Sequence, residues 1–251
     1  MKKLDTSEDI TIIETKKIDV NSPIIIEGVP DMGLVGSIAV SHMILEQNFE
    51  EVGYIKSELF PPVMVVHERK VLNPVRIFQK EKLIVILSEI PIDPKVGYSL
   101  AKRLTEWYKE KGAELIISIS GTPIQERLDI EEPEVFGTSN NSAILEKMEE
   151  SGVKVLEEGF VSGFYALILK NSIELNLNSS ILLAQCYPSY PDPGAGASVL
   201  KVLNKMLNLN VDTKQLIDQA GELKVNYRAL MEQTNVSMQR EPKVEVPTMY
   251  R

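Results

Sequence analysis

The sequence predicts an α/β fold in which a mixed, largely parallel sheet is covered by helices on both faces. Two segments, Ile24–Ile26 and Leu83–Leu87, are apolar without alternation, as strands buried on both faces are. A third segment, Leu115–Ser120, is also expected to be a central strand. Helical patterns alternate with the strands, and the clearest of them covers Pro94–Lys111. This alternation is typical of a sheet with helical layers above and below it.

The turn after the first buried strand begins a strand–turn–helix unit. Gly28 and Pro30 break the strand, and Asp31 is expected to cap the next helix by accepting a hydrogen bond from a first-turn amide. Gly33 and Gly36 lie one turn apart, and their lack of a Cβ would let the helix pack close to its strand. That packing must offset roughly 1 kcal/mol of lost helix propensity per glycine. Because no Gly-x-Gly-x-x-Gly pattern occurs here, a structural role is favoured over a nucleotide site.

The remaining elements follow from hydrophobic periodicity and from turn and capping residues. Further strands are expected at Ile10–Ile18 (an edge strand), Val52–Ser57, Val63–Val66, Val75–Gln79, Val153–Leu156 and Ser179–Tyr187, with Glu68–Asn73 as a polar connection and short strands and loop over Ile124–Asn141. Further helices are expected at Ser142–Glu150, Phe164–Leu169, Ala197–Leu209 and from Val211 to about Gln233, with Asp93, Asn141 and Asp212 as N-caps.

Composition limits the classes of function. A formal net charge of -9 argues against nucleic acid or an anionic membrane as the main partner, because neutralising phosphates requires a basic patch. No apolar run is long enough to span a bilayer. The single cysteine, Cys186, excludes an intrachain disulfide and is expected to be a buried thiol. No signal peptide is recognisable in Met1–Asp5, so a cytoplasmic location is expected.

No arrangement of residues identifies a catalytic centre, a metal site or a cofactor. His42 is expected to be a hydrogen-bonded core or interface residue and His67 to be exposed. Without paired cysteines or a His-x-x-x-His spacing no zinc site is predicted, and no Gly-x-Ser-x-Gly elbow occurs. Glu131-Glu132 and Glu149-Glu150 are interpreted as solvated faces. The segment Asp192–Ser198 could bind an anion through free helix amides, but a plain helix start is favoured.

The segment Gly28-Val29-Pro30-Asp31-Met32-Gly33-Leu34-Val35-Gly36 resembles the opening motif of the proteasome assembly chaperone family, in its archaeal branch. Leu59-Phe60-Pro61-Pro62, Ser88-Glu89-Ile90-Pro91 and Ser120-Gly121-Thr122 resemble later features of this family in the same order. Together these motifs cover most of residues 20 to 205. The resemblance implies a three-layer α/β sandwich similar in shape to nucleoside phosphorylases, with copies of the chain assembling into homo-oligomers.

The last stretch of the chain carries the strongest functional signal. Residues 235–248 lose periodicity and contain two prolines, so a flexible tail that reaches up to about 45 Å is expected. The tail ends in Met249-Tyr250-Arg251, which resembles the hydrophobic–tyrosine–any-residue (HbYX) ending that docks proteasome activators and some assembly chaperones on the core particle. The resemblance implies that Met249 fills an apolar cleft between α-subunits, that Tyr250 adds ring contacts and a hydroxyl, and that the carboxylate of Arg251 pairs with a lysine.

Three functions remain under consideration for a chain divided into an α/β core domain (1–210), a C-terminal helix suited to self-association (211–234) and a tail (235–251). The favoured function is a non-enzymatic chaperone or activator that binds the α-ring of the proteasome core particle and aids assembly or opens the gate. The first alternative is a phosphorylase- or hydrolase-like enzyme acting on a small nucleoside or peptide. The second is a scaffold whose C-terminal helix docks another protein.

Overall fold

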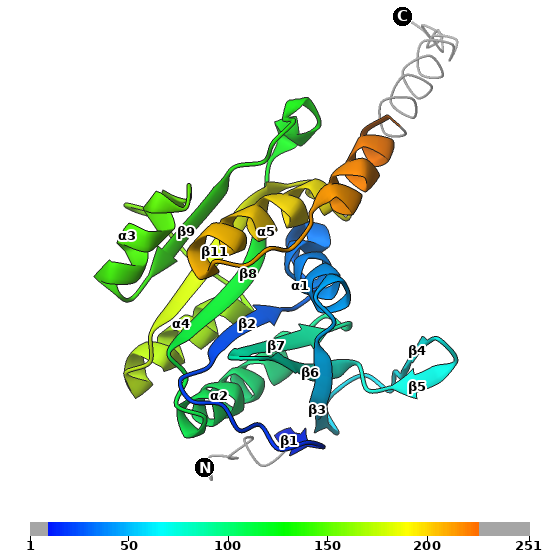
Figure 1. The fold of residues 1–251 in the computed structure, drawn as a ribbon, viewed down its shortest axis with the longest axis vertical. Coiled ribbons are helices and arrows are strands. Elements are labelled where there is room, and N and C mark those ends of the chain that lie inside the picture. Colours follow the sequence, from blue (N-terminus) through cyan, green and yellow to red (C-terminus); the bar gives the residue numbers. More distant parts are fainter. Residues whose placement is uncertain (1–9, 226–251) are drawn as a thin grey trace, which may run out of the picture.

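A nine-stranded sheet runs through the centre of the protein (Figure 1). The computed structural model describes residues 10–225. The order of strands across the sheet is β1-β3-β6-β7-β2-β8-β11-β9-β10. The predicted α/β architecture with a mixed sheet is therefore confirmed.

The four strands at the centre of the sheet run parallel and include the most apolar segments of the sequence. They are β2 (Ile24–Gly28), β7 (Leu83–Ser88), β8 (Leu115–Pro123) and β11 (Ser179–Cys186). The first of these, β2, pairs with β7 on one side and with β8 on the other. These strands can be continuously apolar because helices bury both of their faces.

The outer strands are β1 (Ile10–Glu14), β3 (Glu50–Ser57), β6 (Val75–Lys80), β9 (Val135–Ser139) and β10 (Lys154–Val155). Antiparallel pairings join β6 to β7 and β9 to β11, so the parallel centre is flanked by antiparallel strands. At one edge lies β1, as predicted, and it pairs with β3.

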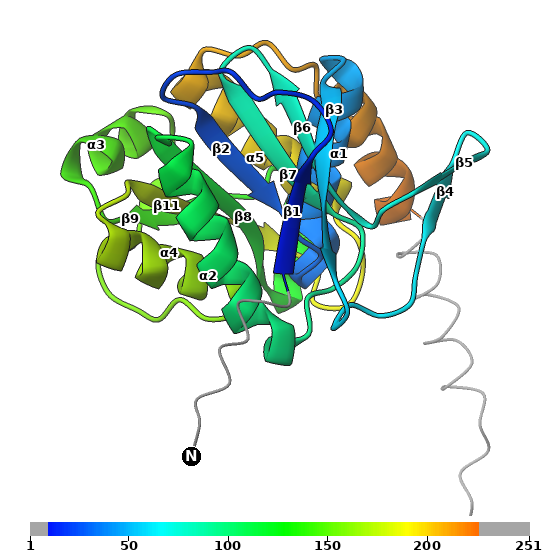
Figure 2. The same cartoon turned by 90° about the horizontal axis from the view of Figure 1, so that it is seen from below.

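A separate hairpin of β4 (Val65–His67) and β5 (Lys70–Leu72) projects away from the body (Figure 2). The prediction of a polar connection over residues 68–73 was therefore wrong for residues 70–72. The chain reverses at Glu68 and Arg69, which both have positive φ angles of 48° and 66°. Two consecutive positive φ values match the twist of a hairpin, but glycine or asparagine normally marks such a turn, and neither residue is present here.

Helices cover both faces of the sheet (Figure 1). Those on one face are α1 (Val35–Glu46), α3 (Ser142–Glu150) and α5 (Pro193–Leu207), and those on the other are α2 (Pro94–Glu110) and α4 (Phe164–Leu175). Short 3-10 turns, η2 (Met32–Leu34) and η3 (Gln125–Asp129), precede α1 and follow β8. A further helix covers residues 214–225 and is called the C-terminal helix below.

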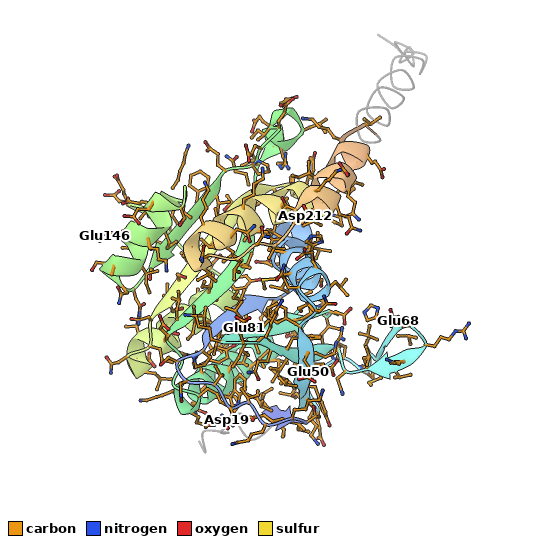
Figure 3. The ribbon with its side chains drawn as sticks, in the orientation of Figure 1. Asp19, Glu50, Glu68, Glu81, Glu146 and Asp212 are labelled. Carbon is orange, nitrogen blue, oxygen red and sulfur yellow. The ribbon has the colours of Figure 1, made fainter. Side chains whose placement is uncertain are left out.

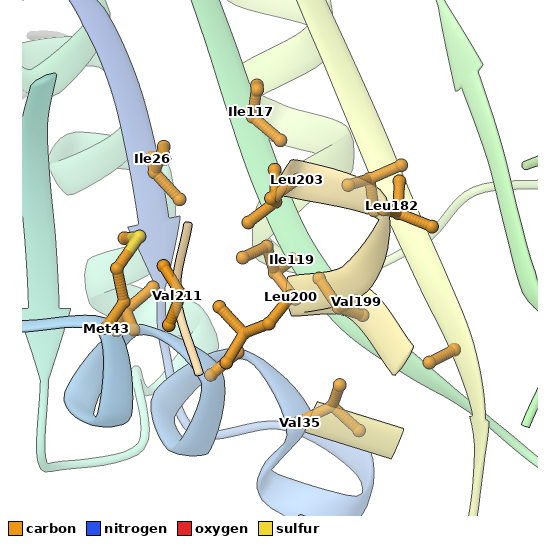
Figure 4. Close-up of a cluster of buried hydrophobic side chains, with 14 of the residues drawn as sticks. Ile26, Val35, Met43, Ile117, Ile119, Leu182, Val199, Leu200, Leu203 and Val211 are labelled. Carbon is orange, nitrogen blue, oxygen red and sulfur yellow. The ribbon is translucent and has the colours of Figure 1, made fainter. Parts of the chain in front are cut away.

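Each face of the sheet has its own hydrophobic core, because successive residues of a strand point to opposite faces. Ile26 belongs to the core between the sheet, α1 and α5, where Met43 and Leu200 also lie (Figure 4). Ile25 belongs to the core beneath α2, together with Leu104. Both faces of β2 are therefore buried, as the uninterrupted apolar sequence predicted.

One carboxyl group lies inside the second core. The side chain of Glu27, near the carboxyl end of β2, is fully buried and accepts hydrogen bonds from the hydroxyls of Tyr108 (2.5 Å) and Ser118 (2.6 Å). Burial raises the pKa of Glu27 to about 7, against the opposing effect of the two hydrogen bonds. This carboxyl group therefore titrates near neutral pH inside the folded protein.

Three of the four predicted helix caps, Asp93, Asn141 and Asp212, are confirmed. The Asp93 carboxylate accepts a hydrogen bond from the amide of Lys95 (2.8 Å), and Asp212 accepts one from the amide of Lys214 (2.9 Å). The side chain of Asn141 accepts hydrogen bonds from two first-turn amides of α3. These caps satisfy amides that have no partner within the helix. Across residues 10–225, no helix is both long and apolar enough to cross a membrane.

Candidate functional site at the carboxyl end of β2

The glycines that follow β2 permit close packing between backbone segments. A Cβ atom added to Gly28 would lie 2.3 Å from the Cγ2 atom of Val40 on α1. A Cβ atom added to Gly36 would lie 2.5 Å from the carbonyl oxygen of Ile119 on β8. The predicted close approach of helix and sheet is confirmed for Gly36, which packs against the neighbouring strand β8. Gly33 lies before α1 with a φ of 62° and faces Cys186 instead. These glycines therefore have a packing role.

The predicted helix cap at Asp31 was wrong. The Oδ2 atom of Asp31 accepts a hydrogen bond from the hydroxyl of Ser120 (2.7 Å), and no side chain caps the turn η2 or the helix α1. The helix begins at Val35, after Leu34 in the left-handed conformation with a φ of 51°. Ser120 and Asp31 are 89 residues apart in the sequence, but the pairing of β2 with β8 brings them together. The Ser120 hydroxyl therefore donates the hydrogen bond that was expected from a first-turn amide of the helix.

A cavity of about 400 Å³ opens beside Asp31, between the first turns of α2 and α4. We call it the β2 cavity; its lining is formed by Val29–Asp31, by Ile92 with the start of α2, and by Gly163–Leu167. The hydroxyl of Tyr165 donates a hydrogen bond to the carbonyl oxygen of Val29 (2.9 Å). Burial, together with the negative charge of Asp31, raises the pKa of Tyr165 well above its ordinary value, so the phenol stays protonated.

The position of the β2 cavity follows from the topology. The chain leaves β2 for α1 on one face of the sheet, whereas α2, which connects β7 to β8, lies on the other face. Ligand sites in open α/β sheets occur at the carboxyl ends of strands, at such divergent connections. The sequence does not reveal this cavity, because its lining comes from three separate segments. The glycine at position 163 directly before an apolar helix was the only local signal.

The predicted helix start at Asp192 is confirmed, and the protein's own carboxylate lies at the position where an external anion was considered. The fully buried carboxylate of Asp192 caps α5 by accepting a hydrogen bond from the amide of Ala195 (2.9 Å). It also forms two hydrogen bonds with Arg127, at 2.7 Å and 3.0 Å. Arg127 lies 5.0 Å from the ring centre of Tyr187. The Asp192 carboxylate therefore supplies the negative charge that the amino end of α5 attracts.

The two histidines form hydrogen bonds as expected of structural residues. His42 contacts the carbonyl oxygen of Asp212 through Nε2 (2.6 Å), so it links α1 to the start of the C-terminal helix. His67, exposed on the hairpin, contacts Glu89 (2.6 Å), which in turn pairs with Arg76 (2.5 Å). Glu89 belongs to the third of the family-like motifs, and its contacts attach the hairpin to the body.

The predictions for the cysteine and the acidic pairs are also confirmed. Cys186 is fully buried beside Gly33, and burial raises the pKa of its thiol to about 12. The pairs Glu131-Glu132 and Glu149-Glu150 are exposed. Figure 3 shows acidic side chains distributed over many elements, including Asp19, Glu50, Glu68, Glu81, Glu146 and Asp212.

Within the part of the chain that the structure describes, no group of three or more metal-ligating side chains is placed to hold a metal ion.

The C-terminal helix is attached to the core through its first turn and through Val211, which lies three residues before the helix. Val211 and Leu216 are buried, and the side chain of Asn204 forms hydrogen bonds with both the amide and the carbonyl of Val211 (3.0 Å and 2.9 Å). The predicted docking residues Met249, Tyr250 and Arg251 lie outside the described residues. The chain thus leaves the core from a fixed position on the side of α1 and α5 (Figure 1).

The fold and the ordered motifs define the class of protein: the chain belongs to the PAC2 family, whose sequence profile matches residues 25–231. The predicted family membership is therefore confirmed. A relative from Methanocaldococcus jannaschii, the uncharacterized protein MJ0106, is 30% identical over 240 residues, which are 96% of this chain and 98% of that protein.

Solved structures that share the fold include two from one archaeon. PbaA of Pyrococcus furiosus, described as an archaeal homolog of proteasome-assembly chaperone, superimposes with a TM-score of 0.79 and 30% identity over 91% of this chain and 95% of that one. PbaB of the same organism, described as an archaeal proteasome activator, superimposes with a TM-score of 0.78 and 23% identity over 89% of this chain and 99% of that one. The second match concerns the fold alone.

Proposed function

We propose that this protein is a non-enzymatic, cytoplasmic factor that binds the α-ring of the proteasome core particle and aids its assembly or opens its gate. The observation that carries the proposal is the likeness to PbaA, an archaeal homolog of proteasome-assembly chaperone, at 30% identity over 91% of this chain. Membership of the PAC2 family across residues 25–231 supports it. The acidic net charge of -9 supports a protein partner over nucleic acid or an anionic membrane.

The docking element in this proposal is the ending Met249-Tyr250-Arg251, with a free carboxylate on Arg251. Met249 fills an apolar cleft between two α-subunits, and Tyr250 contributes a large apolar ring with a hydroxyl for hydrogen bonding. The carboxylate pairs with a lysine of the cleft, and partial removal of water strengthens such a charge-assisted hydrogen bond. Three residues bury little surface, so a single tail binds weakly.

Self-association makes weak tails effective. In the proposed homo-oligomer, each copy presents one tail to the ring, and the second and later tails bind at a high effective concentration. The anchoring of the C-terminal helix supports this arrangement, since the buried side chains of Val211, just before the helix, and Leu216, in its first turn, fix where each chain leaves its core. The avidity of several tails can exceed the affinity of one by about 10²-fold or more.

The test compares the unmodified full-length protein with two variants in two assays. The variants are a deletion of residues 249–251 and a reordered ending, Met249→Tyr, Tyr250→Arg and Arg251→Met, which keeps length, composition and side-chain charge. One assay measures peptide hydrolysis by an archaeal core particle, which reports gate opening. The other measures the yield of core particle assembled from separate α- and β-subunits. Loss of either effect in both variants is expected, and an unchanged effect with the reordered ending would overturn the docking role of the tail.

A further inference from the structure

We propose that the β2 cavity is a binding site for a lysine or arginine side chain of a partner polypeptide, with Asp31 as its counter-ion. This site goes beyond the tail-docking function and does not depend on it. The cavity, about 400 Å³, falls within the range of small-ligand pockets. It can therefore hold one long side chain together with part of the backbone that carries it.

The charge of the lining favours a cation. Asp31 is the only ionisable acid or base, apart from the tyrosine phenols, among the residues that line the cavity, and it is exposed to solvent. The Ser120 hydroxyl occupies one of its oxygens (2.7 Å), and no lysine, arginine or histidine within residues 10–225 forms an ion pair with it. By contrast, Asp192 and Glu89 each pair with an arginine. Asp31 is thus a carboxylate that a ligand can reach and whose charge no described basic side chain balances.

The rest of the lining suits the apolar part of such a side chain. Aromatic residues Tyr98 and Phe164 belong to the walls, with aliphatic Ile92 and Leu167 beside them. Aromatic faces attract lysine and arginine, and aliphatic walls cover their methylene groups. An unpaired carboxylate surrounded by apolar and aromatic groups is the complement of a cationic head on an apolar stem.

A competing effect comes from α4, whose first turn also lines the cavity. Its N-cap, Gly163, has no side chain, so the positive end of this helix favours an anion. The helix end is equivalent to about half an elementary charge, whereas Asp31 carries a full one. The amino end of α2 contributes less, because the Asp93 carboxylate already caps it. The net field in the cavity therefore favours a cation.

The surroundings of the cavity favour a polypeptide over a free amine. Tyr98 is 68% exposed at the cavity, and Phe160, three residues before Gly163, is fully exposed. Met32, next to Asp31, is 46% exposed. Exposed apolar side chains beside a specific pocket are typical of protein interfaces, in which arginine is enriched. A partner that inserts its basic side chain would cover these residues at the same time.

The test uses methyl NMR of the full-length protein, observing the methyl groups of Ile92 and Leu167, which line the cavity. The probes are acetyl-Gly-Ala-X-Ala-Gly-amide peptides in which X is arginine, lysine, citrulline or glutamate, with agmatine as a free guanidinium. Saturable shifts with the arginine and lysine peptides are expected, with affinity at least about tenfold lower for citrulline, the neutral counterpart of arginine. Agmatine, which lacks a peptide backbone, should also bind at least about tenfold more weakly.

Three variants connect binding to the cavity. Asp31→Asn keeps an acceptor for Ser120 but removes the charge, and should lower affinity for the arginine peptide at least about tenfold. Gly97→Leu blocks the cavity while leaving Asp31 in place; a Cβ there meets no atom closer than 3.7 Å, so the backbone tolerates it. The exposed control Asp218→Asn, on the C-terminal helix, should bind as the unmodified protein does. Unchanged methyl spectra away from the cavity establish that each variant is folded.

Four outcomes would overturn the proposal. The first is the absence of shifts at Ile92 and Leu167 at about 10 mM arginine peptide, and the second is tighter binding of the glutamate peptide than of the arginine peptide. The third is equal affinity of the Asp31→Asn variant and the unmodified protein for the arginine peptide. The fourth is binding of agmatine as tight as that of the arginine peptide. The glutamate result would identify an anion site at α4, and the agmatine result a site for free amines. None of these outcomes bears on the tail, which the assembly and hydrolysis assays test separately.

Discussion

Replacement of Glu27 by glutamine is expected to remove a pH-dependent loss of stability. The carboxyl group is fully buried, and its pKa is raised from an ordinary value of 4.5 to about 7. Between these values the unfolded chain is ionised while the native state keeps its proton. The native state then binds more protons, so the free energy of unfolding falls as pH rises, by about 1.4 kcal/mol per pH unit.

The total effect is about 3 kcal/mol, because the two pKa values differ by about 2.5 and both states are ionised above pH 7. Below pH 4.5 the carboxyl group is neutral in both states and the effect vanishes. Glutamine resembles the protonated carboxyl group, since its amide can donate to one hydroxyl and accept from the other. The Glu27→Gln variant should lie within about 1 kcal/mol of the unmodified protein at pH 5 and exceed its stability by up to about 3 kcal/mol near pH 8.

Urea denaturation at several pH values between 5 and 8 measures this difference, because contributions from other titrating groups cancel between variant and parent. The matched control is Glu146→Gln, an exposed carboxylate on α3, which should show little change at any pH. A difference between Glu27→Gln and the parent that stays constant with pH would refute the assignment of Glu27 as a group that titrates near neutrality.

Three further predictions concern packing and burial. Arg127→Met leaves Asp192 buried without a counter-charge, so urea denaturation should show a free energy of unfolding lower by about 3–5 kcal/mol. Adding Asp192→Asn removes the unpaired charge and should recover part of this loss. Gly36→Ala should lower the free energy of unfolding by about 1–3 kcal/mol. In the control Gly221→Ala, the added Cβ meets no atom within 4 Å, and the free energy of unfolding should rise by up to about 1 kcal/mol. Equal effects of the two substitutions would contradict the packing role of Gly36. Cys186, buried with a pKa of about 12, should react with a thiol reagent at pH 8 only after denaturation.

The sequence predicted the central sheet well because burial on both faces leaves a local signature. The runs at Ile24–Ile26 and Leu83–Leu87 are apolar without interruption, and both became central parallel strands. Caps such as Asp93 were also predictable, since the side chain and the amide it binds lie two residues apart. The packing role of Gly36 could be expected from its spacing, but the contact with Ile119 required the strand order.

Contacts between segments that lie far apart along the chain could not be predicted from the sequence. Asp31 has the sequence position of a helix cap, but the β2–β8 pairing offers it Ser120 instead. Glu27 follows an apolar run, and its partners Tyr108 and Ser118 come from two other elements. The β2 cavity needs the first turns of α2 and α4 to converge. The tail prediction depends on a motif, and its residues lie outside the described part of the chain.

The most direct test of the central claim is a binding measurement between an immobilised archaeal core particle and three forms of the protein. These are the unmodified chain, the deletion of residues 249–251 and the reordered ending. The account predicts that the unmodified chain binds and that both altered endings lose at least about tenfold in affinity, since every tail of the oligomer is changed at once. Equal affinity of all three proteins for the core particle would contradict it.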